Sequence, residues 1–140
     1  MFGTIRAAIK TKLTELTGVG QPLVIVYDYH EPHVSGYPAL TFDVSEVTND
    51  FLTTSENVRH YAWKIYVYQQ ISEQVPLQDA IDILDTTADA VIDKIEQNLT
   101  LGNVVDYCRP VVGPRNILSS PQGEALIQEL TLITVVTSVV

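Results

Sequence analysis

Four side chains that commonly bind metal ions lie together in the segment DYHEPH, residues 28–33. These are Asp28, His30, Glu31 and His33. Imidazole nitrogens and carboxylate oxygens are usual ligands of zinc in proteins, so the group has the chemistry of a metal site. Well-built sites take their ligands from rigid elements, however, whereas this segment has the composition of a single turn. We therefore expect a solvated turn, with no metal and no other cofactor.

The short motifs of common catalytic sites do not occur in the sequence. It contains no Gly-x-Ser-x-Gly, phosphate-binding loop, dinucleotide fingerprint or Cys-x-x-Cys. The two glycines of GVGQP, residues 18–22, precede a strand-like segment, whereas a phosphate-binding loop needs them before a helix. The single cysteine, Cys108, lies within another strand-like segment, where a small buried thiol is usual. We therefore expect that the protein is not an enzyme, and that neither His30 nor His33 supports turnover.

A row of carboxylates follows one side of a predicted helix that begins at Pro76 and ends near Gln97. At about 100° per residue, an apolar stripe and an acidic stripe lie side by side on this helix. The acidic stripe consists of Asp79, Asp82, Asp85, Asp89, Asp93 and Glu96. Such a stripe is often only a solvated face. The alternative is a surface that repels a polyanion or meets basic residues on a neighbour, with Arg6 and Lys10 as candidate partners.

Two helices and five strands are predicted, in the order α-β-β-β-α-β-β. The helices are indicated by apolar residues at steps of three and four, and the strands by apolar runs or by alternation. In chain order these elements cover residues 2–16, 23–29, 37–45, 57–71, 76–97, 103–112 and 124–140. The order predicts one α+β domain, residues 1–140, with a mostly antiparallel sheet of about five strands and both helices on one face.

Two of the connections are predicted to be long. Residues 46–57 form a polar segment, and residues 113–123 contain glycine and proline. We expect the first connection to be mobile in the free protein and to become ordered against a neighbour. Its apolar Phe51 and Leu52 have no local reason to be exposed, so we expect both at a contact between subunits.

The strand at residues 57–71 carries apolar or aromatic side chains on both of its faces. One face is predicted to form the core under the helices, and it contains Tyr61, Trp63, Ile65 and Val67. The other face contains His60, Lys64, Tyr66 and Tyr68. The last strand is also apolar on both faces, and two helices cover only one face of a sheet. We therefore expect the second face at contacts between subunits, where Lys64 pairs with a carboxylate across the contact.

Overall composition limits the remaining functions. The chain has 140 residues, of which 46% are hydrophobic, and a net charge of −9 from 17 acidic and 8 basic residues. No basic patch is visible, so tight binding of nucleic acid is not expected. No segment has the length and apolarity of a membrane span, and the basic residues near the N-terminus argue against a signal peptide.

The layout resembles the tail terminator proteins of long-tailed phages and related tail-like particles. The resemblance rests on the start MFGTIRAAIKTKL, on YPALTF, on TTSENVRHYAWKIYVYQ, on the acidic helix and on the C-terminal strand pair. It implies an α/β protein that forms a hexameric ring on the tail tube, stops polymerisation of the tube and offers a surface to the head connector. The implied partners are further copies of the chain, the tail tube protein and the head-side connector protein.

The resemblance also implies a location and a relation to DNA. The protein would lie in the tail of the virion at the head–tail interface, after assembly in the host cytoplasm. DNA would cross the lumen of the ring without specific binding, and a negative lumen would keep phosphates from adhering. Two alternatives remain open: a head-completion or connector adaptor protein, and a small-molecule-binding or hydrolytic domain that uses the tyrosine-rich sheet face as a pocket.

Overall fold

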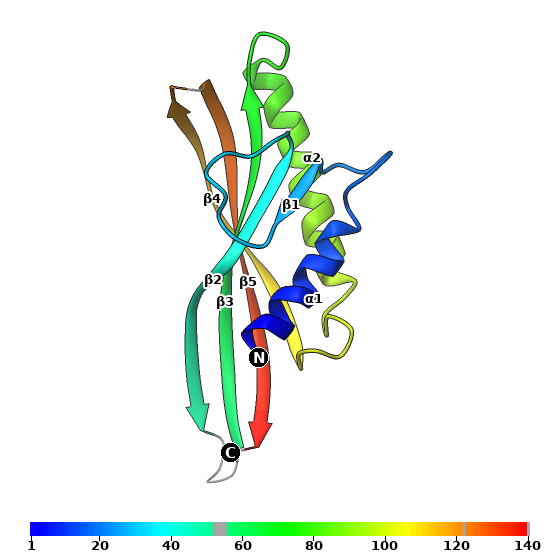
Figure 1. Cartoon of the computed structure of the whole chain (residues 1–140), viewed down its shortest axis with the longest axis vertical. Helices are drawn as coiled ribbons and strands as arrows, with labels where there is room; N and C mark the ends of the chain where they lie inside the picture. The colour runs from blue at the N-terminus through cyan, green and yellow to red at the C-terminus, as the bar shows by residue number, and fades with distance from the viewer. Residues whose placement is uncertain (52–55, 122, 140) are drawn as a thin grey trace.

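The fold consists of two helices and one five-stranded sheet, in the predicted order α-β-β-β-α-β-β (Figure 1). The computed structural model describes residues 1–51, 56–121 and 123–139. The elements are α1 (Phe2–Thr14), β1 (Ile25–Tyr27), β2 (Ala39–Phe51), β3 (Glu56–Ile71), α2 (Leu77–Glu96), β4 (Tyr107–Ser120) and β5 (Gly123–Val139). The strand order in the sheet is β1-β2-β3-β5-β4, and every pair is antiparallel except β1 with β2. The predicted α+β class is confirmed.

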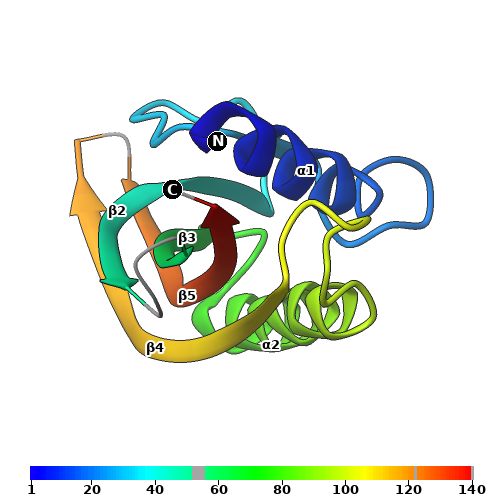
Figure 2. The same cartoon turned by 90° about the horizontal axis from the view of Figure 1, so that it is seen from below.

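Both helices pack on the same side of the sheet (Figure 2). Helix α1 buries Ile5, Ile9 and Leu13, as their spacing predicts, and Gly18 and Gly20 then turn the chain with φ of +107° and +78°. In helix α2 the N-cap is Pro76, which needs no hydrogen-bond acceptor for a backbone N–H because it has none. Among the described residues, no helix has the length and apolar character needed to span a membrane.

The central strand β3 places its two faces as predicted. Tyr61, Trp63, Ile65 and Val67 are at most 1% exposed and form the core beneath the helices. Trp63 lies opposite Leu132 of β5, and its ring contacts Phe42 of β2 edge to face. The core is therefore built across β2, β3 and β5, which the chain brings together from distant segments.

The predictions of long connections at residues 46–57 and 113–123 are wrong where the structure describes these segments; residues 52–55 lie outside the described ranges. Residues 46–51 continue strand β2, and residues 113–120 continue strand β4; register shifts occur at Val44/Glu46 and at Val112/Arg115. Beyond both helices, β2, β3 and β5 extend as an arm at one end of the molecule (Figure 1). Residues 114–120 of β4 are exposed on both faces, so this segment lacks the apolar–polar alternation that identifies a strand in sequence. Strand β1 is also shorter than predicted, three residues in place of seven.

The second face of the sheet is partly covered by the chain itself. The segment between β1 and β2 crosses this face near β2 (Figure 1). There His30 contacts both Thr41 and Tyr66. The face was expected to need a neighbouring chain; near Tyr66 the protein supplies part of the cover from its own loop.

Candidate interaction surfaces

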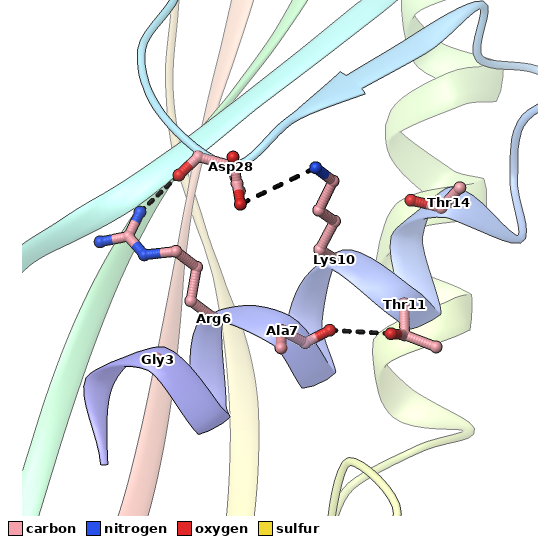
Figure 3. A pocket seen from close by; sticks show the side chains of 7 residues that line it. All are labelled: Gly3, Arg6, Ala7, Lys10, Thr11, Thr14 and Asp28. Atoms are coloured by element: carbon pink, nitrogen blue, oxygen red, sulfur yellow. Dashed lines mark hydrogen bonds and ion pairs between the residues drawn. The ribbon is translucent and has the colours of Figure 1, made fainter.

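Three of the four potential metal ligands in residues 28–33 have different partners: Asp28 pairs with Lys10, His30 contacts Thr41, and Glu31 accepts from Tyr29. The Asp28 carboxylate lies 3.8 Å from Lys10 Nζ, and the backbone carbonyl of Asp28 accepts a hydrogen bond from the Arg6 guanidinium (Figure 3). The Glu31 carboxylate accepts hydrogen bonds from the Tyr29 hydroxyl, at 2.8 Å, and from the His33 backbone N–H, at 3.1 Å. Among the described residues, no three His, Cys, Asp or Glu side chains are grouped closely enough to hold a metal ion.

His30 has a structural position on the outer face of the sheet. Its Nδ1 lies 3.1 Å from the Thr41 hydroxyl, and its ring centroid lies 5.0 Å from that of Tyr66. Burial lowers the pKa of His30, against the opposing effect of the Asp43 carboxylate. The contacts favour a neutral imidazole that pins the loop to the sheet.

A shallow hollow of about 500 Å³ lies along the outer side of α1 (Figure 3). Its lining consists of Gly3, Arg6, Ala7, Lys10, Thr11, Thr14 and Asp28. Arg6 and Lys10 are already engaged by Asp28, and Thr11 donates to the carbonyl of Ala7 within the helix. The charged side chains that line the hollow, Arg6, Lys10 and Asp28, are thus all engaged in ion pairs within the chain.

Cys108 is buried at the beginning of β4, at 2% exposure. Burial raises the pKa of this thiol to about 11. Because the thiolate is the reactive form of cysteine, the side chain is poorly suited to nucleophilic chemistry near neutral pH. The expectation of a small buried thiol is confirmed.

Lys64, Tyr66 and Glu129 form one cluster on the outer face of the sheet. Lys64 Nζ lies 3.4 Å from the Glu129 carboxylate and donates to Thr131 Oγ1 at 3.1 Å. The carboxylate partner that was expected across a subunit contact therefore lies in the same chain. The Tyr66 hydroxyl donates to Glu129 at 3.5 Å, and burial followed by the Glu129 charge raises the pKa of Tyr66.

The remaining predicted interface residues lie at different places. Tyr68 is half-buried, 6.3 Å from Tyr66 between ring centroids, and it lines a hollow of about 510 Å³ between the β1–β2 loop and the β4–β5 hairpin. His60 lines a separate groove of about 360 Å³ on the same face, formed by residues of β2, β3, β4 and β5. Phe51 is the last residue of β2, and Leu52 lies outside the described residues.

All six carboxylates of the predicted acidic stripe are exposed on α2. Asp85 forms an ion pair of 2.6 Å with Arg115 of β4. The suggested partners are engaged elsewhere within the chain, since Arg6 pairs with Asp43 and Lys10 with Asp28. Lys94, on the same helix, pairs with Glu15 of another segment. The stripe is thus an exposed acidic surface with Arg115 as the ion-pair partner among the described residues.

Strand β4 exposes apolar side chains that the sequence analysis did not single out. Val112, Ile117 and Leu118 are 64%, 51% and 52% exposed, and Val111 is 39% exposed. Because β4 is the last strand of the sheet, one side of its backbone has no neighbouring strand among the described residues. Long apolar edge strands are frequent sites of association. In the sequence, the run NIL within residues 113–123 was the pattern that could have indicated this surface, but the surrounding turn residues favoured a loop.

Among the solved structures that resemble this chain is one whose fold matches it over nearly the whole length of both chains. It is a chain of the structure described as "Virion of native gene transfer agent (GTA) particle", with a TM-score of 0.61 and 17% sequence identity. The match covers 97% of this chain and 96% of that chain. The two chains share one fold. The sequence itself matches no protein-family model and no curated protein.

The Arg6–Asp43 ion pair leads to a pH-dependent prediction. Burial acts to raise the pKa of Asp43. The net pKa is nevertheless lowered, because Arg6 and the Val44 backbone N–H both donate to the Asp43 carboxylate. A lowered folded-state pKa stabilises the fold above the unfolded-state value of about 3.9, and this contribution is lost as pH falls through the folded-state value.

We therefore expect Asp43→Asn to lower the free energy of unfolding at pH 7. The gap in this free energy between the variant and the unmodified protein should be smaller at pH 3. Urea unfolding at both pH values measures it. Asp89→Asn, at an exposed carboxylate of α2, is the matched control and should show no such gap. A gap for Asp43→Asn that is the same at both pH values would contradict the assignment.

Proposed function

We propose that this chain is a structural protein of a phage-like virion and acts as its tail terminator. In this role a ring of copies, six in number, caps the tail tube, ends its polymerisation and presents a surface to the head-side connector. The observation that carries the proposal is the fold shared over 97% of the chain with a chain of a virion structure. The sequence resemblance to tail terminators narrows the role within the virion.

Features of the surface support an assembling protein over a catalyst. The exposed apolar residues of β4 lie on an open sheet edge. Three of the four potential ligands in residues 28–33, Asp28, His30 and Glu31, are engaged in contacts within the chain. A ring needs two different surfaces that are complementary to each other, and an unpaired edge with apolar side chains is suitable as one of them.

The acidic stripe suits a surface that DNA passes without binding. Its six carboxylates are exposed on one helix, and the net charge of the chain is −9. Like charges on a lumen wall and on DNA phosphates repel, which keeps passage free of specific contacts. We propose that α2 contributes to the wall of the lumen, and that His60, Tyr66 and Tyr68 lie near contacts between subunits.

The experiment that tests the function is assembly of particles with and without this protein. Without it, tubes are expected to vary widely in length and to remain unattached to heads; adding the purified protein should restore a defined end. Electron microscopy of the tubes and native mass measurement of the purified protein give the readouts. Tubes of normal length with unattached heads would instead indicate the head-completion adaptor. A monomer that turns over a small molecule, with activity lost in His30→Ala, would indicate the hydrolytic alternative.

A further inference from the structure

One row of residues across the outer face of the sheet carries opposite charges at its two ends. Glu46 of β2 lies opposite Ala62 of β3, Ala62 opposite Ile133 of β5, and Ile133 opposite Arg109 of β4. The same four residues line the groove of about 360 Å³ on this face. Glu46 and Arg109 are therefore at the same height of the sheet, on the same face and on opposite rims.

Both charged side chains are exposed and lack an ion-pair or hydrogen-bond partner among the residues that the structure describes. Three strand spacings, about 14 Å measured along the sheet, separate their backbones, and no ion pair joins the two side chains within one molecule. Most other basic side chains in the described ranges have an acidic partner, including Arg6, Lys64 and Arg115. Arg109 is thus a free cation on a protein with a net charge of −9.

Both ends of this row lie on open backbone edges. Strand β4 is the last strand of the sheet. At the other rim, β1 pairs only with Ala39–Thr41, so β2 has no neighbouring strand at Glu46 among the described residues. Open edges of this kind accept a further strand through backbone hydrogen bonds.

The strand directions of the two edges are compatible. From β2 through β3 and β5 to β4, each strand is antiparallel to the one before, so β4 runs opposite to β2. If a second copy is placed beside the first in the same orientation, its β2 is antiparallel to β4 of the first. Such a pairing continues the sheet and covers Val111 and Val112 at the β4 edge. Pro110 offers no backbone donor, so side chains must supply part of the specificity.

We infer that copies of this chain associate head to tail. The β4 edge of one copy lies against the open edge of β2 around Glu46 in the next copy, so that Arg109 faces Glu46 of the neighbour. The occupant is a second copy because one molecule supplies both complementary charges in the same row. A two-fold contact between two β4 edges would instead bring the two Arg109 side chains towards each other. The inference rests on the proposed assembly into a ring and names its contact; a head-to-tail contact closes into a ring when its rotation allows.

A disulfide experiment tests the contact directly. Glu46→Cys and Arg109→Cys are combined in one chain that also carries Cys108→Ala, to remove the native thiol. Within one molecule the two new cysteines are about 14 Å apart, whereas a disulfide requires Cα atoms within about 7 Å. Oxidation of the assembled protein should therefore give covalent multimers, seen on a denaturing gel without reductant. Each single-cysteine variant in the same background is a matched control and should stay monomeric on that gel.

Each other outcome overturns the inference in a recognisable way. Covalent dimers of the Arg109→Cys variant alone would show a two-fold β4 contact. A ring by native mass measurement with no cross-linking in the double variant would overturn this contact and leave the proposed function standing. A protein that remains monomeric at all concentrations would overturn both.

Charge exchange gives a second, independent readout. Arg109→Glu and Glu46→Arg should each raise the dissociation constant of the assembly, on the order of tenfold, because like charges then face each other. The double exchange restores opposite charges and should recover assembly close to that of the unmodified protein. Sedimentation measures all three variants. Two single effects that merely add in the double variant would contradict a direct pairing.

Discussion

Replacing Trp63 with alanine is expected to unfold the protein under conditions in which the unmodified chain is stable. Trp63 is fully buried at the centre of β3, with its ring 6.1 Å from that of Phe42. Its indole N–H donates to the hydroxyl of Thr134, also fully buried, at 3.1 Å. Removal of a buried aromatic ring costs about 3–5 kcal/mol, and a domain is stable by only about 5–15 kcal/mol.

The measurement is urea unfolding followed by circular dichroism. Trp63→Phe is the matched control, since it keeps much of the volume and loses the hydrogen bond to Thr134; it should cost less than Trp63→Ala. An alanine variant with an unfolding midpoint near that of the unmodified protein would show that this ring is not central to the core.

Replacing Tyr66 with alanine is expected to weaken assembly while the monomer stays folded. Tyr66 lies on the opposite face of the same strand, part-buried beside His30 and Tyr68. At a subunit contact its ring would bury apolar area while the hydroxyl keeps its bond to Glu129. Loss of an anchoring aromatic typically costs more than about 1 kcal/mol of association energy.

Sedimentation beside circular dichroism separates the two effects of Tyr66→Ala. Tyr66→Phe retains the ring and should assemble nearly as well as the unmodified protein. His30→Ala removes the intramolecular contact of the ring but leaves Tyr66 in place, so it shows how much of any effect passes through the β1–β2 loop. Normal assembly of Tyr66→Ala, or its unfolding, would mean that this face of β3 has another role.

The elements with a strong apolar period were predictable from the sequence. Ile5, Ile9 and Leu13 recur at helical spacing, and α1 buries all three. The two faces of β3 were assigned correctly, because alternation around Tyr61 to Val67 directly reflects which side of a strand is dry. For the same reason α2 presents its acidic stripe to solvent. Each of these segments is buried on one side only, and one-sided burial produces the apolar period that can be recognised in the sequence.

The surfaces with partners distant in the chain were decided only by the tertiary structure. Residues 114–120 of β4 are exposed on both faces, so they carry no period from which a strand could be recognised. Lys64 with Glu129, and His30 with Tyr66, meet because strand pairing and a loop crossing bring them together. Glu46 and Arg109 share one row only through three successive strand registers. Register is set by packing between segments far apart in the chain, and no short stretch of sequence contains that information.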